Sequence, residues 1–241
     1  GSGAIVMSSQ FWGRKEFDSM RVVAAIALRL TFVLCALFTV VTVLFPALVL
    51  RVFTNDSGII QTGAEYMRLV AFTFLPSGLV STATYLLRSA GNVRIPLIGS
   101  SIAFFLNLFF NWVFIFGKLG APRLELVGAA VGTLIARGFE FCFVFGYFIL
   151  KDTDFGFRIR HILQSRRQLN RRYFQYSIPV LVSDTILGLS LMLTVVILGH
   201  IGEEISAANA IVNSAVQVLT VLNMGMAGAS AVVIGNTIGT G

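Results

Sequence analysis

The chain has 241 residues, of which 56% are hydrophobic and 12% are charged, and its formal net charge is +7 at pH 7. A soluble domain of this length needs far less apolar side chain, and the mean hydropathy of +0.85 is typical of a membrane protein. The basic residues collect in a few segments between apolar runs, which argues against a nucleic-acid-binding surface. The two cysteines lie inside apolar runs, so the sequence predicts no metal site and no disulfide framework.

Apolar runs follow one another along the chain, and a helix needs about 20 such residues to cross a bilayer. Residues 1–12 are typical of the last turns of a membrane helix, and 51–65 is predicted to be a loop. Spans are predicted at 24–50, 65–87, 95–117, 126–150, 177–199 and 207–238. Pro76 is expected to kink the second of these spans. Because no run alternates apolar and polar residues, as a membrane barrel would, we predict an all-α polytopic membrane protein. It would hold about six full spans plus the end of another.

The loops on the two sides of the predicted membrane differ in basic residues. Twelve fall on one side, namely Arg14, Lys15, Arg21, Arg88, Arg94, Lys151, Arg158, Arg160, Arg166, Arg167, Arg171 and Arg172. The other side has three, namely Arg51, Lys118 and Arg123. Because basic loops remain in the cytoplasm, loops 13–21, 88–95 and 151–175 are predicted to be cytoplasmic in a multi-pass plasma-membrane protein. The linker 151–175 is expected to act as an orientation signal and to form an interfacial amphipathic helix.

Two apolar runs, joined by a short turn, carry polar side chains at similar depths. Asn107 and Asn111 are four residues apart, so both amides lie on one helix face, about 15 Å and 9 Å from its end. Thr133 lies about 10 Å into the returning helix, where Gly128 and Gly132 let another backbone approach closely. These side chains either hold the helices together or form the wall of a polar cavity.

Charged residues inside the predicted spans are few. Asp184 lies five residues after Pro179, and a charged aspartate at the bilayer centre costs about 2.5–3.5 kcal/mol on insertion scales. It is therefore a candidate for cation or substrate binding, or else a satisfied structural acid near the interface. Arg137 and Glu140 are three residues apart and can pair on one face. They are a structural pair or secondary candidates for the site.

Two distant segments resemble each other. SGAIVMSSQFWG at 2–13 aligns with GASAVVIGNTIG at 228–239, an offset of 226 residues. Each has small residues, then aliphatic ones, then an amide (Gln10 or Asn236) that is followed three residues later by glycine. Two repeated six-helix halves are common in secondary transporters. The chain is thus expected to begin and to stop near the end of the second helix of each half. Both amides are secondary site candidates.

Six segments, in this order, resemble the multidrug and toxic compound extrusion (MATE) family of cation-coupled exporters. They are GAIVMSSQFWGRKEFD, YLLRSAGNVRIPLIGSS, NLFFNWVFIFGKLGAPRLELVGAAVGTLIAR, SIPVLVSDTILGL, LGHIGEEISAANAIV and GASAVVIGNTIG. The resemblance implies twelve helices in two six-helix lobes, around a central cavity. Residues 1–150 would form the amino-terminal lobe, 151–175 the cytoplasmic linker, and 176–241 the start of the carboxy-terminal lobe.

The resemblance also implies a function and a cation site. Family members export amphiphilic or cationic compounds, driven by Na⁺ or H⁺, and build a site from an Asp on the first helix, Asn and Asp on the fifth, and Thr on the sixth. The last three fall on Asn107, Asn111 and Thr133. Asn111 replaces an acid here, so these three carry no titratable group. The seventh-helix acid of some members falls on Gly188 rather than on Asp184.

Two other classes of protein would require different residues inside the membrane. A lipid-linked precursor flippase or polysaccharide exporter would hold a cationic cluster in its cavity, whereas the arginines within spans are Arg29, Arg68 and Arg137. An enzyme would need paired carboxylates or a His–Asp set at one membrane face, and the acids are scattered. We therefore expect a transporter without a cofactor, monomeric, with lipid and a small-molecule substrate as partners and no nucleic acid.

Overall fold

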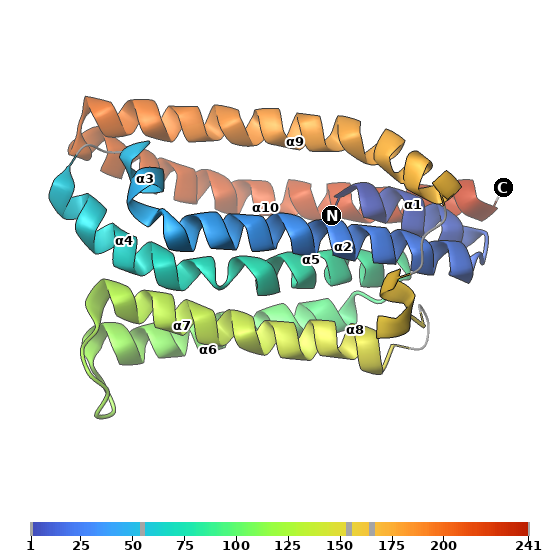
Figure 1. Ribbon diagram of the computed structural model, residues 1–241, viewed down its shortest axis with the longest axis horizontal. Coiled ribbons are helices and arrows are strands. Elements are labelled where there is room, and N and C mark those ends of the chain that lie inside the picture. The colour runs from blue at the N-terminus through green and yellow to red at the C-terminus, as the bar shows by residue number, and fades with distance from the viewer. Residues whose placement is uncertain (1, 54–55, 153–155, 164–166, 241) are drawn as a thin grey trace.

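A computed structural model describes residues 2–53, 56–152, 156–163 and 167–240, and every regular element in these ranges is a helix. Most helices run nearly parallel to the long axis of the molecule (Figure 1). In chain order the elements are α1 (Ser2–Gly13), α2 (Phe17–Leu44), α3 (Pro46–Arg51), α4 (Ser57–Ala71), α5 (Phe74–Ser89), α6 (Arg94–Phe116), α7 (Glu125–Glu140), the π-helical turn η1 (Phe141–Phe145), α8 (Gly146–Leu150), the 3₁₀ helix η2 (Ile159–Leu163), α9 (Arg167–Ile201) and α10 (Glu203–Thr240).

The predicted fold class is confirmed. Within the described ranges, five helices are long and apolar enough to cross a membrane, or six if α4 and α5 form one bent span. The five are Phe17–Leu44, Arg94–Phe116, Glu125–Leu150, Leu169–Gly199 and Ala207–Thr240. Their large apolar side chains remain widely exposed, as expected where lipid or further helices cover a bundle.

The predicted loop 51–65 is wrong over most of its length, because α4 begins at Ser57. Asp56 caps this helix, and its Oδ1 accepts hydrogen bonds from the backbone N–H groups of Gly58 (2.7 Å) and Ile59 (3.1 Å). An aspartate in this position satisfies backbone donors that lack a partner within the helix. The sequence signal was therefore present in Asp56.

The bend in this span lies before Pro76 rather than at it. Helices α4 and α5 meet at 44° across a short break, and Pro76 is the third residue of α5. A proline is tolerated there because the first N–H groups of a helix have no intrahelical partner. The last part of the predicted linker 151–175 is helical, because α9 begins at Arg167.

The α6–α7 hairpin is closely packed. Gly117 ends α6 in the left-handed conformation with φ 64°, which suits a residue without a Cβ. At Gly128 a Cβ would lie 2.7 Å from the carbonyl group of Phe114. Glycine at this position therefore lets the two backbones approach, which brings the polar residues of both helices together.

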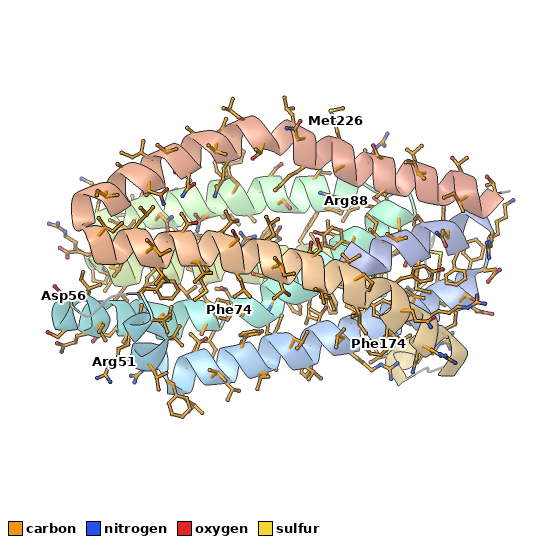
Figure 2. All side chains as sticks on the ribbon, turned by 90° about the horizontal axis from the view of Figure 1, so that it is seen from above. Arg51, Asp56, Phe74, Arg88, Phe174 and Met226 are labelled. Atoms are coloured by element: carbon orange, nitrogen blue, oxygen red, sulfur yellow. The ribbon has the colours of Figure 1, made fainter. Side chains whose placement is uncertain are left out.

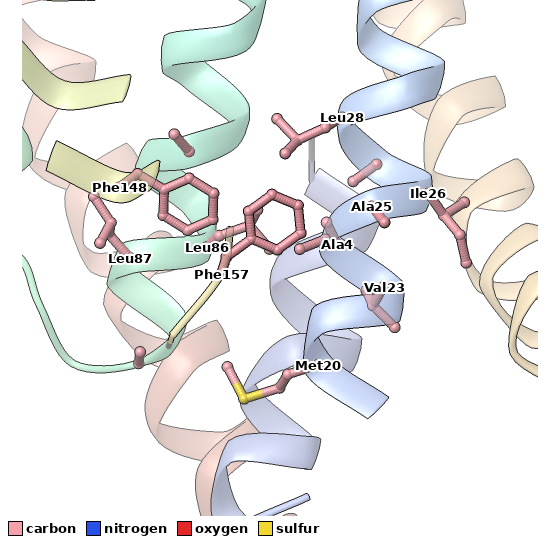
Figure 3. Packing of buried hydrophobic residues seen from close by; sticks show 14 of the residues in the cluster. Ala4, Met20, Val23, Ala25, Ile26, Leu28, Leu86, Leu87, Phe148 and Phe157 are labelled. Carbon is pink, nitrogen blue, oxygen red and sulfur yellow. The ribbon is translucent and has the colours of Figure 1, made fainter. Parts of the chain in front are cut away.

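The hydrophobic core lies at the end of the bundle where α1, α2, α5, α8 and the linker meet (Figure 3). Phe148 and Phe157 are fully buried there and stack with their ring centroids 5.3 Å apart. The Arg158 guanidinium donates from Nη1 to the carbonyl oxygens of Ile149 (3.1 Å), Asp152 (3.1 Å) and Phe157 (2.8 Å). The first part of the linker is thus anchored on the membrane helices.

His161 completes this anchor. Its buried side chain accepts a hydrogen bond at Nδ1 from the backbone N–H of Arg158, at 2.9 Å. Burial lowers the pKa of His161, the neighbouring cations Arg21, Arg160 and Arg158 lower the pKa further, and Asp18 opposes them. Protonation of Nδ1 would also remove the acceptor. The neutral histidine is therefore the form that the fold favours.

The anchor should loosen in mild acid. Because the folded-state pKa of His161 lies below its value of about 6.5 in an unfolded chain, the stabilisation is complete above that pH. It is lost as the pH falls from there through the lowered folded-state pKa. Hydrogen exchange over 156–163, corrected for intrinsic rates, should show less protection at about pH 5.5 than at about pH 7.5. The variant His161→Gln should lose this difference, and equal protection of the unaltered protein at both pH values would contradict the role.

Candidate functional site

Asn107, Asn111 and Thr133, here named the amide–hydroxyl cluster, form a chain of hydrogen bonds between α6 and α7. Asn111 donates from Nδ2 to Oδ1 of Asn107 at 3.1 Å, and Asn107 donates from Nδ2 to Oγ1 of Thr133 at 3.2 Å. The Thr133 hydroxyl then donates to the carbonyl oxygen of Ala129, at 2.8 Å. The structure thus brings all three predicted side chains together, on facing sides of two apolar helices.

Glycine makes this proximity possible. A Cβ at Gly132 would overlap Oδ1 of Asn111 and lie 3.1 Å from its backbone nitrogen. That amide oxygen is buried and has no hydrogen-bond partner among the described residues. Since buried polar atoms are nearly always satisfied, such an oxygen calls for a water or an ion.

Two members of the cluster reach open space. Asn107 and Thr133 line a cavity of about 430 Å³, here named the inner cavity, whereas Asn111 is not among its lining residues. The other residues that line it are Ser100, Ala103, Phe104, Ala136, Arg137 and Glu140. Polar side chains therefore face a cavity within spans whose exposed surface is mostly apolar.

Arg137 and Glu140 form the predicted pair at the far end of the inner cavity. The side chain of Glu140 is 5% exposed, and its Oε2 accepts from Nη1 of Arg137 at 2.6 Å. Its Oε1 accepts from the Ser100 hydroxyl of α6 at 2.8 Å. The π-helical turn η1 follows directly after Glu140, and such turns are frequent at functional sites. Glu140 is the carboxylate that lines the inner cavity.

A second cavity of about 330 Å³, here named the hydroxyl-lined cavity, continues from the first one past Arg137 and Glu140. It is lined by Ser77, Val80, Ser81, Thr84, Tyr85, Arg88, Ser100, Arg137 and Glu140. Sequence reasoning missed the polar residues of α5. Their signal is the helical spacing of Ser77, Ser81, Thr84 and Arg88, which puts one polar stripe on one face.

A third cavity of about 430 Å³, here named the apolar-walled cavity, opens between the α5–α6 corner and α10. Arg88 belongs to both the second and the third cavity. The other residues around the third are Gly91, Val93, Leu97, Gly225, Gly228, Ala229, Val232 and Val233. The three cavities therefore form a series that runs from the amide–hydroxyl cluster to α10.

Asp184 lies apart from the cluster. It is on an exposed part of α9, and α9 lies at the opposite edge of the bundle from the α6–α7 hairpin (Figure 1). It is not among the residues that line the three cavities. The predicted set of Asn107, Asn111, Thr133 and Asp184 is thus divided between two regions.

Gln10 and Asn236 lie where α1 packs against α10. A Cβ at Gly13 would overlap the backbone oxygen of Asn236 and lie 2.9 Å from the Cα of Gly239. Reciprocally, a Cβ at Gly239 would overlap the backbone oxygen of Gln10 and lie 2.9 Å from the Cα of Gly13. The two resembling segments therefore contact each other in the paired manner of a two-fold interface.

The chain is similar to known proteins in both sequence and structure. The family model described as MatE matches residues 1–113. The probable multidrug resistance protein YoeA of Bacillus subtilis is 22% identical over 215 residues, which cover 88% of this chain and 46% of that protein. The probable multidrug resistance protein NorM of Thermotoga maritima is 33% identical over 95 residues, 37% of this chain and 20% of that protein.

Solved structures show the same fold. A crystal structure of MATE in the bent conformation aligns with a TM-score of 0.78 at 18% identity, and covers 99% of this chain and 53% of that one. An inward-facing multidrug resistance MATE family transporter of the MOP superfamily aligns with a TM-score of 0.59 at 17% identity, and covers 73% of this chain and 42% of that one.

Long apolar helices that enclose polar cavities define an integral membrane protein. The family match over residues 1–113, the similar curated proteins and the shared fold make this chain similar to transporters of the MATE family. The chain spans 46% of the length of YoeA, about half of that relative.

Proposed function

We propose that this protein is a secondary active transporter that exports amphiphilic compounds across the plasma membrane by cation antiport with alternating access. The MatE family match over residues 1–113 and the multidrug resistance names of similar proteins support export. The observation that carries the coupling proposal is the amide–hydroxyl cluster, which opens on a cavity inside apolar spans.

The chemistry of the cluster favours Na⁺ over H⁺ as its ligand. Its ligating atoms are two amide oxygens and one hydroxyl oxygen, and none of them gains or loses a proton near neutral pH. Oxygen donors of this kind suit hard metal cations. The buried Oδ1 of Asn111, without a partner in the described part of the chain, is an acceptor that Na⁺ would satisfy.

Binding would compete with the existing hydrogen bonds. Na⁺ at these oxygens would compete with the hydrogen bond from Asn111 to Oδ1 of Asn107 and with the one from Asn107 to Oγ1 of Thr133. Weakening the bond to Thr133 would loosen the contact between α6 and α7, and weakening the bond within α6 would release the amide of Asn111. The cation would thereby favour the conformation that releases substrate, and by linkage substrate would favour release of the cation.

The arrangement of the loops supports the proposed orientation. The segments 13–21 and 88–95, which include the ends of the adjoining helices, lie at one end of the bundle together with the start of 151–175, where α1 also contacts α10 (Figure 1). We assign this end to the cytoplasm because it holds most of the basic residues. The contact between Gly13 and Gly239 would then close the cytoplasmic end between the two proposed lobes.

Dye efflux from vesicles that contain the full-length protein tests this proposal. An imposed Na⁺ gradient should drive efflux, and Asn107→Ala combined with Asn111→Ala should reduce the rate at least about tenfold, equivalent to about 1.4 kcal/mol. Gln61→Ala removes an exposed amide on α4, outside the three cavities, and should leave the rate unchanged. If the double variant matched the unaltered protein, the cluster would not be the coupling site.

A further inference from the structure

The hydroxyl-lined cavity contains more positive than negative charge. Two guanidinium groups, from Arg88 and Arg137, line it together with a single carboxylate, that of Glu140. Both oxygens of this carboxylate are already engaged, one by Arg137 and the other by the Ser100 hydroxyl. In the part of the chain that the structure describes, Arg88 has no carboxylate within 4.0 Å. One positive charge therefore remains without a counter-charge.

Hydroxyl groups line the same cavity as this positive charge. Ser77, Ser81 and Thr84 extend along α5 toward Arg88, and Tyr85 adds a phenol. Hydroxyls can donate hydrogen bonds to an anion, and a guanidinium can bind a carboxylate or a phosphate with two parallel hydrogen bonds. A cationic ligand would instead meet the donors and the charge of the arginines. The lining thus favours an anionic group.

An apolar space adjoins this anion-binding lining. Arg88 stands between the hydroxyl-lined cavity and the apolar-walled cavity, whose other wall is α10. Figure 2 shows Arg88 on the side of the bundle that faces α10. Leu97, Val232 and Val233 supply apolar surface within reach of the same guanidinium. A ligand with an anionic group at one end and an apolar body at the other would fill both cavities.

We propose that Arg88 and Arg137 bind the anionic group, a carboxylate or a phosphate, of an amphiphilic ligand whose apolar body lies against α10. As a statement about the exported compound, this rests on the proposed transport function. It narrows the substrate class to anionic or zwitterionic amphiphiles, and it separates their site from the Na⁺ ligands Asn107 and Asn111. If Arg88 served only to keep its loop in the cytoplasm, it would have to be basic, but the protein would show no preference for an anionic ligand.

Equilibrium binding to the purified full-length protein tests the proposal without transport. The probes are rhodamine 110, which has a free carboxylate, and rhodamine 123, its methyl ester, followed by fluorescence anisotropy. We expect the unaltered protein to bind the acid about tenfold more tightly than the ester, as expected for a charge-assisted hydrogen bond. Arg88→Gln should abolish this preference while binding of the ester persists, which shows that the variant is folded.

Arg94→Gln is the matched control, because Arg94 lies six residues further on in an exposed position outside the three cavities. It should retain the preference. Arg137→Gln is combined with Glu140→Gln, so that no buried carboxylate is left without its cation, and the pair should weaken binding of the acid. Equal affinity for both dyes, no binding of the acid, or the same effect from Arg88→Gln and Arg94→Gln would overturn the proposal.

The source of the anionic group is resolved by competition. Displacement of rhodamine 110 by phosphatidylglycerol but not by phosphatidylcholine would assign the site to an anionic lipid headgroup, and no displacement by either would assign it to a free amphiphile. Both results support a site for an anionic group. Failure of Na⁺-driven efflux would overturn the transport function and leave the dye preference intact, so the two proposals fail separately.

Discussion

Valine in place of Gly239 is expected to separate α1 from α10. The added Cβ would overlap the backbone oxygen of Gln10 and lie 2.9 Å from the Cα of Gly13, and a backbone cannot move aside as a side chain does. Overpacking of this kind costs about 1–3 kcal/mol, which would shift the balance between packed and separated helices by about 5- to 150-fold.

Distances between spin labels measure this separation. Lys15, in the loop after α1, and Thr240, the last residue of α10, are both exposed. Spin labels on cysteines at these two positions should report a longer distance in Gly239→Val. Gly188→Val is the control, because a Cβ at Gly188 in α9 has no neighbour within 4 Å. An unchanged distance distribution in Gly239→Val would show that the helices are not held together at this contact.

Removal of Glu140 should be the most destabilising change in the cavities. In Glu140→Ala the Ser100 hydroxyl loses its acceptor and Arg137 loses its counter-charge. The carboxylate is buried but Arg137 is 49% exposed, so the arginine can recover water, and we expect a loss of about 1–3 kcal/mol. Equilibrium unfolding in denaturant would measure this loss in the free energy of unfolding.

The same helix provides a control for this prediction. Glu125 pairs with Arg123 at 3.2 Å, but both side chains are 70% exposed, so Glu125→Ala should cost less than about 1 kcal/mol. The double variant Arg137→Met with Glu140→Leu should lose less free energy of unfolding than Arg137→Met and Glu140→Leu lose in sum when each is made alone. Similar losses for Glu140→Ala and Glu125→Ala would show that burial adds nothing to the pair.

Local sequence signals predicted much of the fold. Hydropathy and length located the spans, since both follow from the thickness of a bilayer. Helical spacing and depth predicted that Asn107, Asn111 and Thr133 could meet, because the short turn of the hairpin leaves little freedom in how α6 and α7 align. The start of α4 was missed, although Asp56 is a standard N-cap residue, because the capping signal was outweighed by the polar composition of the segment.

The remaining features depend on contacts between distant segments. The polar stripe of α5 could not be recognised as a cavity wall from the sequence. That role depends on Arg88 and Arg137 lining one cavity, and these residues are 49 positions apart in the chain. Asp184 was grouped with the cluster on residue type, whereas the packing of α9 places it at another edge of the bundle. The resemblance of 2–13 to 228–239 did not predict their mutual contact, because a repeat in sequence does not specify which faces pack.

Titration of Na⁺ into the purified full-length protein, followed by calorimetry in a choline-based buffer, tests most directly whether the amide–hydroxyl cluster holds the coupling cation. Saturable Na⁺ binding is predicted for the unaltered protein. It should be lost when Asn107→Ala is combined with Thr133→Val, and retained in Gln61→Ala. Na⁺ affinity that is the same in all three proteins would contradict a cation site between α6 and α7.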